Sequence, residues 1–244
     1  MKETLIQDET GRKVTWEQLV QENARLRGDL RTIATRINHD LRTPLGGIIN
    51  TGELLKEILA ESNSDSLPLA GSLFTSVDEM AKLIGQLRFI AKASADSKPK
   101  ERVDMGLVVP GVLARLESKI LKKSAVVTSP DAWPEVNGVN DWLEFIWLNL
   151  LTNALQHAGE KPRIELGWHK EDAAFRFQVC DRGGGVPADT GAKLFQPFDS
   201  LHKSGSTRGL GLSIVQRLVD LQGGNCGYAP NPQGGACFYF TLPR

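Results

Sequence analysis

The chain has 244 residues, of which 41% are hydrophobic, and this is enough for one or two compact units with a buried core. Its 29 Lys and Arg residues balance 29 Asp and Glu residues, so the charge gives no support for a nucleic-acid-binding protein, which usually carries a basic excess. The three cysteines, Cys180, Cys226 and Cys237, lack a CxxC spacing, so we expect reduced thiols and neither a zinc site nor a disulfide framework. No apolar run approaches the roughly 18 residues of a membrane span. We therefore expect a cytoplasmic segment without membrane contact, while a longer parent protein could carry a membrane or cytoplasmic sensor.

Residues 14–60 have the apolar pattern of a nearly continuous helix. Two series of residues recur every seven positions and alternate at steps of three and four, as in the seam of a coiled coil; an amphipathic helix packed on its own domain is the alternative. Polar residues 61–66 predict a turn, and a second amphipathic helix follows from about residue 68. One hairpin exposes too much apolar surface, so we expect a homodimer that closes a four-helix bundle. The two series are Trp16, Asn23, Leu30, Ile37 and Leu19, Leu26, Ile33.

A polar, proline-containing stretch, residues 94–100, predicts a linker between this hairpin and a second domain. Beyond it, helical and strand patterns mix, which predicts an α/β sandwich with a mostly antiparallel sheet and an α+β chain as a whole. Asp141 and Glu144 occupy the positions of a capping box at the start of one helix. The predicted helices cover residues 107–123, 142–158 and 210–221, and the predicted strands cover residues 163–168, 174–180, 225–228 and 236–241, the first two as an antiparallel hairpin.

Residues 38–45, Asn-His-Asp-Leu-Arg-Thr-Pro-Leu, place a histidine beside a carboxylate, just before a helix-bending proline. A neutral imidazole has a free lone pair on one ring nitrogen near pH 7, and this nitrogen can attack a phosphorus atom. The octet resembles the H box of the sensor histidine kinases of two-component systems. The resemblance implies that His39 accepts a phosphoryl group, that Asp40 binds the other ring nitrogen, and that Thr43 serves the removal of phosphate from the partner's aspartate.

Residues 149–157 place Asn149, Asn153 and His157 on one helical face, because they are spaced four residues apart. Amide oxygens suit Mg²⁺, although two surface asparagines at this spacing are commoner than a metal site. The segment resembles the N box of the same family. The resemblance implies that Asn149 and Asn153 bind Mg²⁺ and that His157 extends the nucleotide site. The box often has Lys and Tyr where this chain has Gln156 and His157, and the missing Lys is expected to weaken phosphate binding.

Glycines gather between the second predicted strand and the third predicted helix. Residues 181–187 resemble the first glycine box of the family, which implies that Asp181 binds the adenine amino group while Gly183 and Gly185 let the backbone approach the base. Residues 207–215 resemble the second glycine box at a helix start, where backbone amides attract phosphates. The resemblance implies a nucleotide contact surface made by Lys203, Arg208, Gly209, Leu210 and Gly211.

The order of N box, first glycine box, F box (residues 194–198) and second glycine box is that of the Bergerat or GHKL ATP-binding fold, which gyrase, Hsp90 and MutL-type ATPases share. The first glycine box departs from the family at Arg182, where Asn is usual, and the second at Thr207, where Gly is frequent. The resemblance implies three parts: a lead-in and coiled coil, a dimerisation and histidine phosphotransfer domain, and a catalytic ATP-binding domain. Their expected bounds are residues 1–31, 32–97 and 98–244.

The implied function is that of an ATP- and Mg²⁺-dependent autokinase that phosphorylates His39 and passes the phosphoryl group to an aspartate of a response-regulator receiver domain. Two alternatives stay open. A gyrase- or Hsp90-like ATPase would need a water-activating Glu one turn before the metal Asn, and that position holds Asn149. A nucleotide-binding pseudokinase or dimeric scaffold without turnover fits the departures from the family, because a fold does not fix an activity.

Overall fold

The computed structural model divides the chain into two compact units, Met1–Ser97 and Lys98–Arg244, called here the N-terminal and C-terminal units. We describe each by itself. The described residues are 5–7, 13–15, 20–21, 46–53, 55, 57–59, 71, 77, 80–81, 84–86, 89, 93, 98–187, 194–195 and 211–244.

In the N-terminal unit, a short antiparallel pair of strands precedes the helical residues. Strands β1 (Leu5–Gln7) and β2 (Lys13–Thr15) pair with Leu5 opposite Thr15. The helix predicted from residue 14 is wrong at its start, because residues 14 and 15 belong to β2. The described residues from 20 onward on both sides of the predicted turn are helical, among them residues 46–53, so they agree with the two predicted helices. The predicted turn at residues 61–66 and every residue of the predicted heptad seam lie outside the described residues. No helix among the described residues has both the length and the apolar character needed to cross a membrane.

The C-terminal unit is built on a mixed five-stranded sheet with the strand order β4-β6-β7-β9-β8. The β4–β6 pair is parallel and the other pairs are antiparallel, in agreement with the mostly antiparallel sheet predicted from the sequence. A separate two-stranded sheet pairs β3 with β5. The strands are β3 (Glu101–Asp104), β4 (Val126–Thr128), β5 (Glu135–Gly138), β6 (Arg163–Lys170), β7 (Ala174–Asp181), β8 (Cys226–Pro230) and β9 (Ala236–Pro243).

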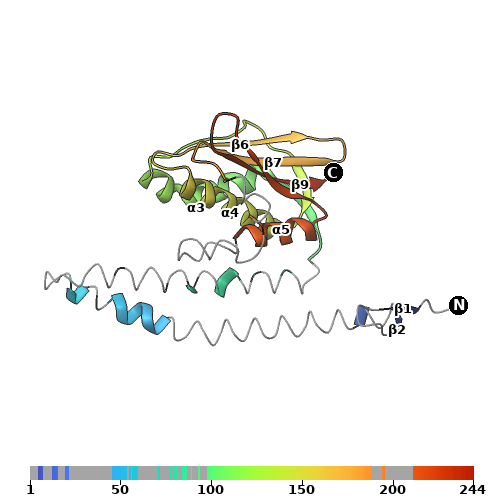
Figure 1. The fold of residues 1–244 in the computed structure, drawn as a ribbon, viewed down its shortest axis with the longest axis horizontal. Coiled ribbons are helices and arrows are strands. Elements are labelled where there is room, and N and C mark those ends of the chain that lie inside the picture. Colours follow the sequence, from blue (N-terminus) through green and yellow to red (C-terminus); the bar gives the residue numbers. More distant parts are fainter. Residues whose placement is uncertain are drawn as a thin grey trace. The chain divides into compact units, whose positions relative to one another are not determined.

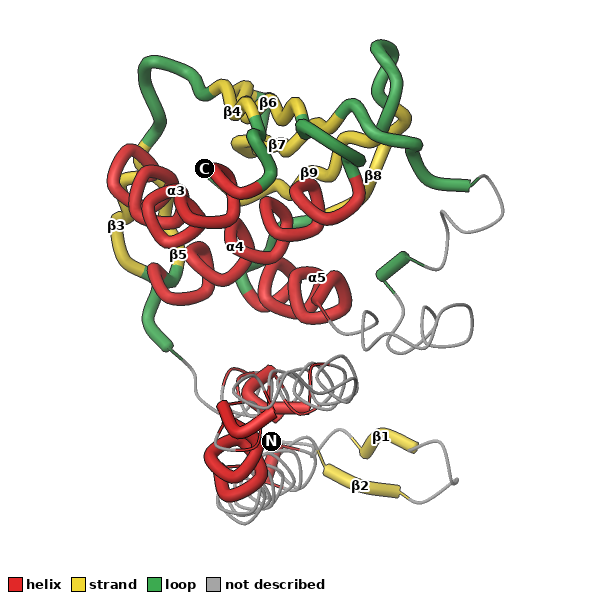
Figure 2. The backbone as a smooth tube through the Cα atoms, turned by 90° about the vertical axis from the view of Figure 1, so that its left-hand side faces the viewer, coloured by secondary structure: helices red, strands yellow, loops and turns green. Residues whose placement is uncertain are grey.

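Three helices of the described part lie on one face of the five-stranded sheet: α3 (Met105–Lys122), α4 (Asn140–His157) and α5 (Gly211–Leu221) (Figures 1 and 2). The middle helix is held by an aromatic cluster. The fully buried ring of Trp147 stands edge-on to Phe240 on β9 at 5.5 Å and to Phe177 on β7 at 6.1 Å between ring centroids. Such pairs contribute about 1 kcal/mol each beyond the burial of their area. The cluster therefore fixes α4 against the centre of the sheet.

A buried glutamine at the end of α5 binds the start of α4, and the sequence analysis did not single it out. The start of α4 has no capping side chain of its own, and the predicted capping box of Asp141 and Glu144 is wrong. The helix begins two residues earlier than that box requires, and the cap residue is Val139. Its backbone N–H donates instead to Oε1 of Gln222, at 2.9 Å, just beyond α5. Gln222 is 0% exposed, and its Nε2 donates to the carbonyl oxygen of Leu218 at 3.1 Å.

We expect Gln222→Ala to destabilise the C-terminal unit by about 1–3 kcal/mol, because the Val139 N–H would lose its partner in a buried position. Urea unfolding followed by circular dichroism would measure the loss. Gln216→Ala is the matched control, since Gln216 is an exposed residue of α5. Equal losses in the two variants would contradict the capping role.

Candidate functional site

The predicted metal-binding asparagines lie on the half-buried side of α4, as expected from their spacing. Nδ2 of Asn149 donates to the carbonyl oxygen of Phe145 at 2.9 Å. A carbonyl oxygen can only accept hydrogen bonds, so the NH₂ group of Asn149 faces Phe145. The amide oxygen of Asn149 therefore points away from its own helix. A Cβ at Gly211, the first residue of α5, would lie 2.7 Å from that oxygen. The structure thus brings together the N-box asparagine and the last glycine of the second glycine box, and a larger residue at position 211 would have to displace the amide of Asn149.

The first glycine box packs against the end of α4. Asp181 is the last residue of β7 and is 4% exposed. Its Oδ1 accepts a 2.8 Å hydrogen bond from the backbone N–H of Gly183. A Cβ at Gly183 would lie 2.6 Å from the carbonyl oxygen of His157, so the loop needs glycine to approach the helix this closely. A carboxylate has about four lone-pair sites, so Asp181 keeps the capacity to accept a further donor.

The hairpin between β8 and β9 also packs against Asp181, and the sequence analysis missed this contact. Nδ2 of Asn231 donates to the backbone oxygen of Asp181 at 2.8 Å. A Cβ at Gly235 would lie 2.7 Å from Oδ1 of Asp181, and one at Gly185 would lie 3.3 Å from the carbonyl oxygen of Gly235. The turn composition of residues 231–235 signals a hairpin, but it carries no information about which loop that hairpin contacts.

The cysteines correct one expectation. Cys180 and Cys237 form a disulfide between β7 and β9, with their Cα atoms 4.0 Å apart, and are not reduced thiols. The sequence could not reveal the pair because 57 positions separate them, and only the antiparallel register places them opposite each other. Cys226 is free and half-buried. Burial, and secondarily the nearby carboxylate of Asp220, raise the pKa of this thiol to about 12, so it stays protonated near neutral pH.

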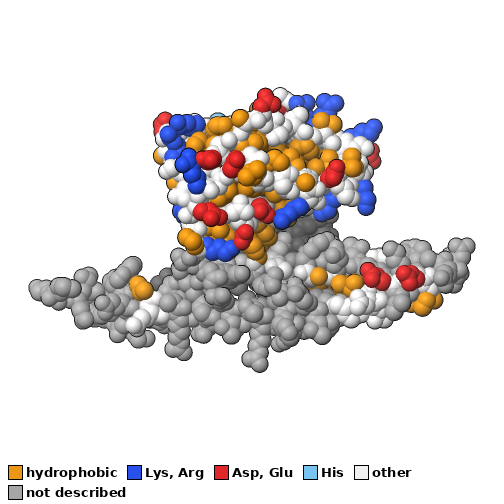
Figure 3. Space-filling model, turned by 180° about the vertical axis from the view of Figure 1, so that it is seen from behind, with side chains coloured by type: hydrophobic (Ala, Val, Ile, Leu, Met, Phe, Trp, Pro, Cys, Tyr) orange, Lys and Arg blue, Asp and Glu red, His pale blue; other side chains and the backbone are white. Residues whose placement is uncertain are grey.

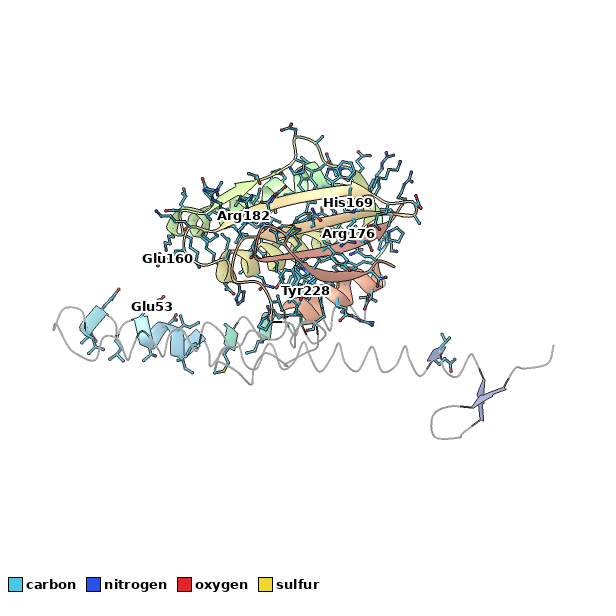
Figure 4. The ribbon with its side chains drawn as sticks, turned by 45° about the horizontal axis from the view of Figure 1, so that its top comes forward. Glu53, Glu160, His169, Arg176, Arg182 and Tyr228 are labelled. Atoms are coloured by element: carbon cyan, nitrogen blue, oxygen red, sulfur yellow. A yellow bond between two sulfur atoms is a disulfide. The ribbon has the colours of Figure 1, made fainter. Side chains whose placement is uncertain are left out.

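The candidate site therefore lies where β7 ends, between α4 and the start of α5. Figure 4 shows Arg182, the residue after Asp181, at the opposite end of the β6–β7 hairpin from His169 and Arg176. On the face drawn in Figure 3, basic and acidic side chains of the C-terminal unit are mixed, with hydrophobic side chains between them. The buried carboxylate of Asp181 can accept a hydrogen bond from the amino group of a base. The amide oxygen of Asn149 can bind a hard cation, and the start of α5 can bind an anion.

Several predicted site residues lie outside the described part of the chain. The structure brings together Asn149, His157, Asp181, Gly183 and Gly211 by the contacts given above, and Asn153 lies one turn after Asn149 on the same helix. The residues whose placement is not described are His39, Asp40, Thr43, Lys203, Arg208, Gly209 and Leu210.

Two families of domains match the chain, one in each unit. Residues 29–96 match the His Kinase A (phospho-acceptor) domain. Residues 138–244 match the family described as histidine kinase-, DNA gyrase B-, and HSP90-like ATPase. The second match spans α4, the Asp181 loop and α5, which carry the geometry described above.

Individual histidine kinases resemble the chain over most of its length. The methanogenesis regulatory histidine kinase FilI of Methanothrix harundinacea (strain 6Ac) is 27% identical over 85% of this chain and 24% of its own length. The sensor protein KdpD of Escherichia coli (strain K12) is 29% identical over 92% of this chain and 26% of its own length. The chain thus spans about a quarter of these curated relatives. Full-length ShkA, crystallised in complex with AMPPNP, superposes on 87% of this chain and 45% of its own with a TM-score of 0.66 and 26% identity. With a phospho-acceptor domain followed by a GHKL-type ATP-binding domain, the chain belongs to the sensor histidine kinases.

Proposed function

We propose that this chain is an ATP-dependent protein-histidine autokinase that phosphorylates His39 and passes the phosphoryl group to an aspartate of a response-regulator receiver domain. The observation that carries the proposal is the close packing of both glycine boxes on α4: Gly183, which binds Asp181, meets the carbonyl oxygen of His157, and Gly211 meets the amide oxygen of Asn149. The same chain carries an H box, whose His39 supplies a nucleophile.

In the proposed complex, the adenine amino group donates to the carboxylate of Asp181, and the base lies against the backbone of Gly183 and Gly185. These loop positions have no side chain, so the base can approach the backbone closely. The phosphates lie toward the second glycine box, where the amides at the start of α5 and the charges of Arg208 and Lys203 attract anions.

The donor set fits Mg²⁺. The amide oxygen of Asn149 is turned out of its helix by the bond from Nδ2 to Phe145, and Asn153 lies one turn further on. Mg²⁺ is held in proteins by few oxygen ligands, with phosphate oxygens and water completing the set, so two amides are adequate. When bound, the ion neutralises charge on the phosphates; Asn149 and Asn153 would hold it there.

The proposed nucleophile is the unprotonated ring nitrogen of His39. Asp40 accepts a hydrogen bond from the other ring nitrogen, which fixes the tautomer and raises the basicity of the attacking nitrogen. The new bond joins this nitrogen to the γ-phosphorus, the bond between the γ-phosphorus and the β–γ bridging oxygen of ATP breaks, and ADP leaves with the electron pair. The proton on the other ring nitrogen passes to Asp40. Positioning and charge neutralisation supply most of the rate in such transfers.

Thr43, one turn after His39, is proposed to orient water when the enzyme removes phosphate from the regulator. We further propose a homodimer formed by the helices of the N-terminal unit, and a cytoplasmic location, where ATP is available.

Incubation of the chain with Mg·ATP labelled on its γ-phosphate tests the proposal. We expect the protein to become labelled, and the label to be lost in acid and kept in base, as a phosphorus–nitrogen bond requires. Release of phosphate without protein labelling would instead indicate a gyrase- or Hsp90-like ATPase. Nucleotide binding without labelling or phosphate release would indicate a pseudokinase or scaffold. Offering the labelled protein to a panel of receiver domains then identifies the partner regulator.

A further inference from the structure

Cys180 and Cys237 join the two strands at the point where the sheet meets the candidate nucleotide site. The ladder between β7 and β9 runs from Ala174 opposite Pro243 to Cys180 opposite Cys237, so the disulfide closes its last rung. The next residue along β7 is Asp181, which pairs with Ile164 of β6. The covalent bond is therefore adjacent in the chain to the proposed adenine acceptor.

Both strands leave the disulfide toward Asp181. Gly235, the residue before β9, lies two positions before Cys237, and a Cβ at Gly235 would lie 2.7 Å from Oδ1 of Asp181. In the same hairpin, Asn231 donates to the backbone oxygen of Asp181. The acceptor is thus held between β7 and the β8–β9 hairpin, and the disulfide is the covalent bond between those two elements.

Helices α3, α4 and α5 cover one face of the five-stranded sheet and leave the other open (Figures 1 and 2), and strand alternation places the disulfide on the open face. Side chains alternate along a strand, and the neighbours Val179 and Phe238 are buried on the helix side. Cys180 is 8% exposed, and Cys237 is half-buried and therefore the more accessible sulfur. Cys226 is opposite Phe240, a residue buried on the helix side of the sheet, so Cys226 lies on the helix side as well. The disulfide lies on the opposite face, so Cys226 cannot exchange with Cys180 or Cys237.

We propose that Cys180 and Cys237 form a reversible thiol–disulfide site that sets the affinity of the Asp181 pocket for adenine nucleotides; this inference rests on the proposed function. Disulfides in a reducing cytosol are usually transient or redox-sensing. The bond holds the last rung of the ladder closed. Without it, the end of the ladder is free to fray, as the ends of elements do, and the Asp181 loop loses part of its preorganisation for the base.

The chemistry balances as ordinary thiol–disulfide exchange. A small dithiol reductant attacks Sγ of Cys237 as a thiolate, the sulfur–sulfur bond breaks, and Cys180 leaves as a thiolate that takes up a proton. The second thiol of the reductant then displaces the sulfur of Cys237 and closes its own disulfide. Two electrons and two protons pass to the protein. In the reverse direction a small-molecule disulfide, such as oxidised glutathione, accepts them.

Calorimetric titration with ADP tests the proposal on the whole chain equilibrated with oxidised glutathione or with dithiothreitol. Alkylation and mass spectrometry count the free thiols in each state. We expect the reduced chain to bind ADP about fivefold more weakly, which is the lower range for coupling between two sites. The control Cys226→Ser should respond in the same way. Cys180→Ser and Cys237→Ser should bind ADP as the reduced chain does, with no response to reductant.

Equal ADP affinity in the two states, or three alkylated cysteines in the oxidised state, would overturn the proposal. The comparison of the two states of the unchanged chain needs no variant, so it decides the question even if a serine variant fails to fold. ADP binding in neither state would refute the proposed function itself, and this redox inference with it.

Discussion

Replacement of His39 by Gln is expected to abolish acid-labile labelling from γ-labelled ATP, because the amide nitrogen of Gln has no lone pair able to attack phosphorus. ADP affinity should stay unchanged, since the proposed nucleotide contacts all belong to the C-terminal unit. Autoradiography after acid and base treatment, together with calorimetry, measures both quantities.

His169→Gln provides the control for the loss of an imidazole. His169 is an exposed residue at the end of β6 and lies 3.4 Å from a carboxylate oxygen of Glu171, far along the strand from the Asp181 loop. This variant should label like the unchanged chain. Acid-labile label that persists in His39→Gln would show that another residue accepts the phosphoryl group.

Asp181→Asn should weaken ADP binding by at least about tenfold, because a hydrogen bond to a charged acceptor is worth about 1.5–3 kcal/mol. Asn keeps an oxygen that can accept the N–H of Gly183, so the loop conformation is retained. Its amide nitrogen, however, would face the adenine amino group as a second donor. Labelling at ATP concentrations below saturation should fall in the same proportion.

Asp172→Asn is the matched control, since Asp172 is an exposed residue in the turn between β6 and β7. Calorimetry with ADP should give this variant the affinity of the unchanged chain. If Asp181→Asn binds ADP as tightly as Asp172→Asn, Asp181 does not contact the nucleotide. The burial of Asp181 would then be explained only by the packing of the glycine loop.

The elements that follow from local pattern were predictable. Helices α3, α4 and α5 agree with the predicted ranges to within two residues, because each buries one stripe of a 3.6-residue period. Strands β6 and β7 show the alternation of a sheet with one covered face, and they form the predicted antiparallel hairpin. The short strands β3, β4 and β5 were not predicted, since three or four residues carry too little pattern, and their partners lie far along the chain.

The sequence by itself predicted which residues carry the proposed chemistry, because the H box, the N box and the glycine boxes combine rare residue types at close spacing. Only the tertiary structure decided how Asp181 is held. Asn231 and Gly235 reach it, and Cys237 reaches the neighbouring Cys180, because β9 lies between β7 and β8. The cap of α4 comes from Gln222 because α5 packs beside α4. The physical reason is that strand order and helix packing bring together groups 50 to 83 residues apart, and no local propensity encodes such contacts.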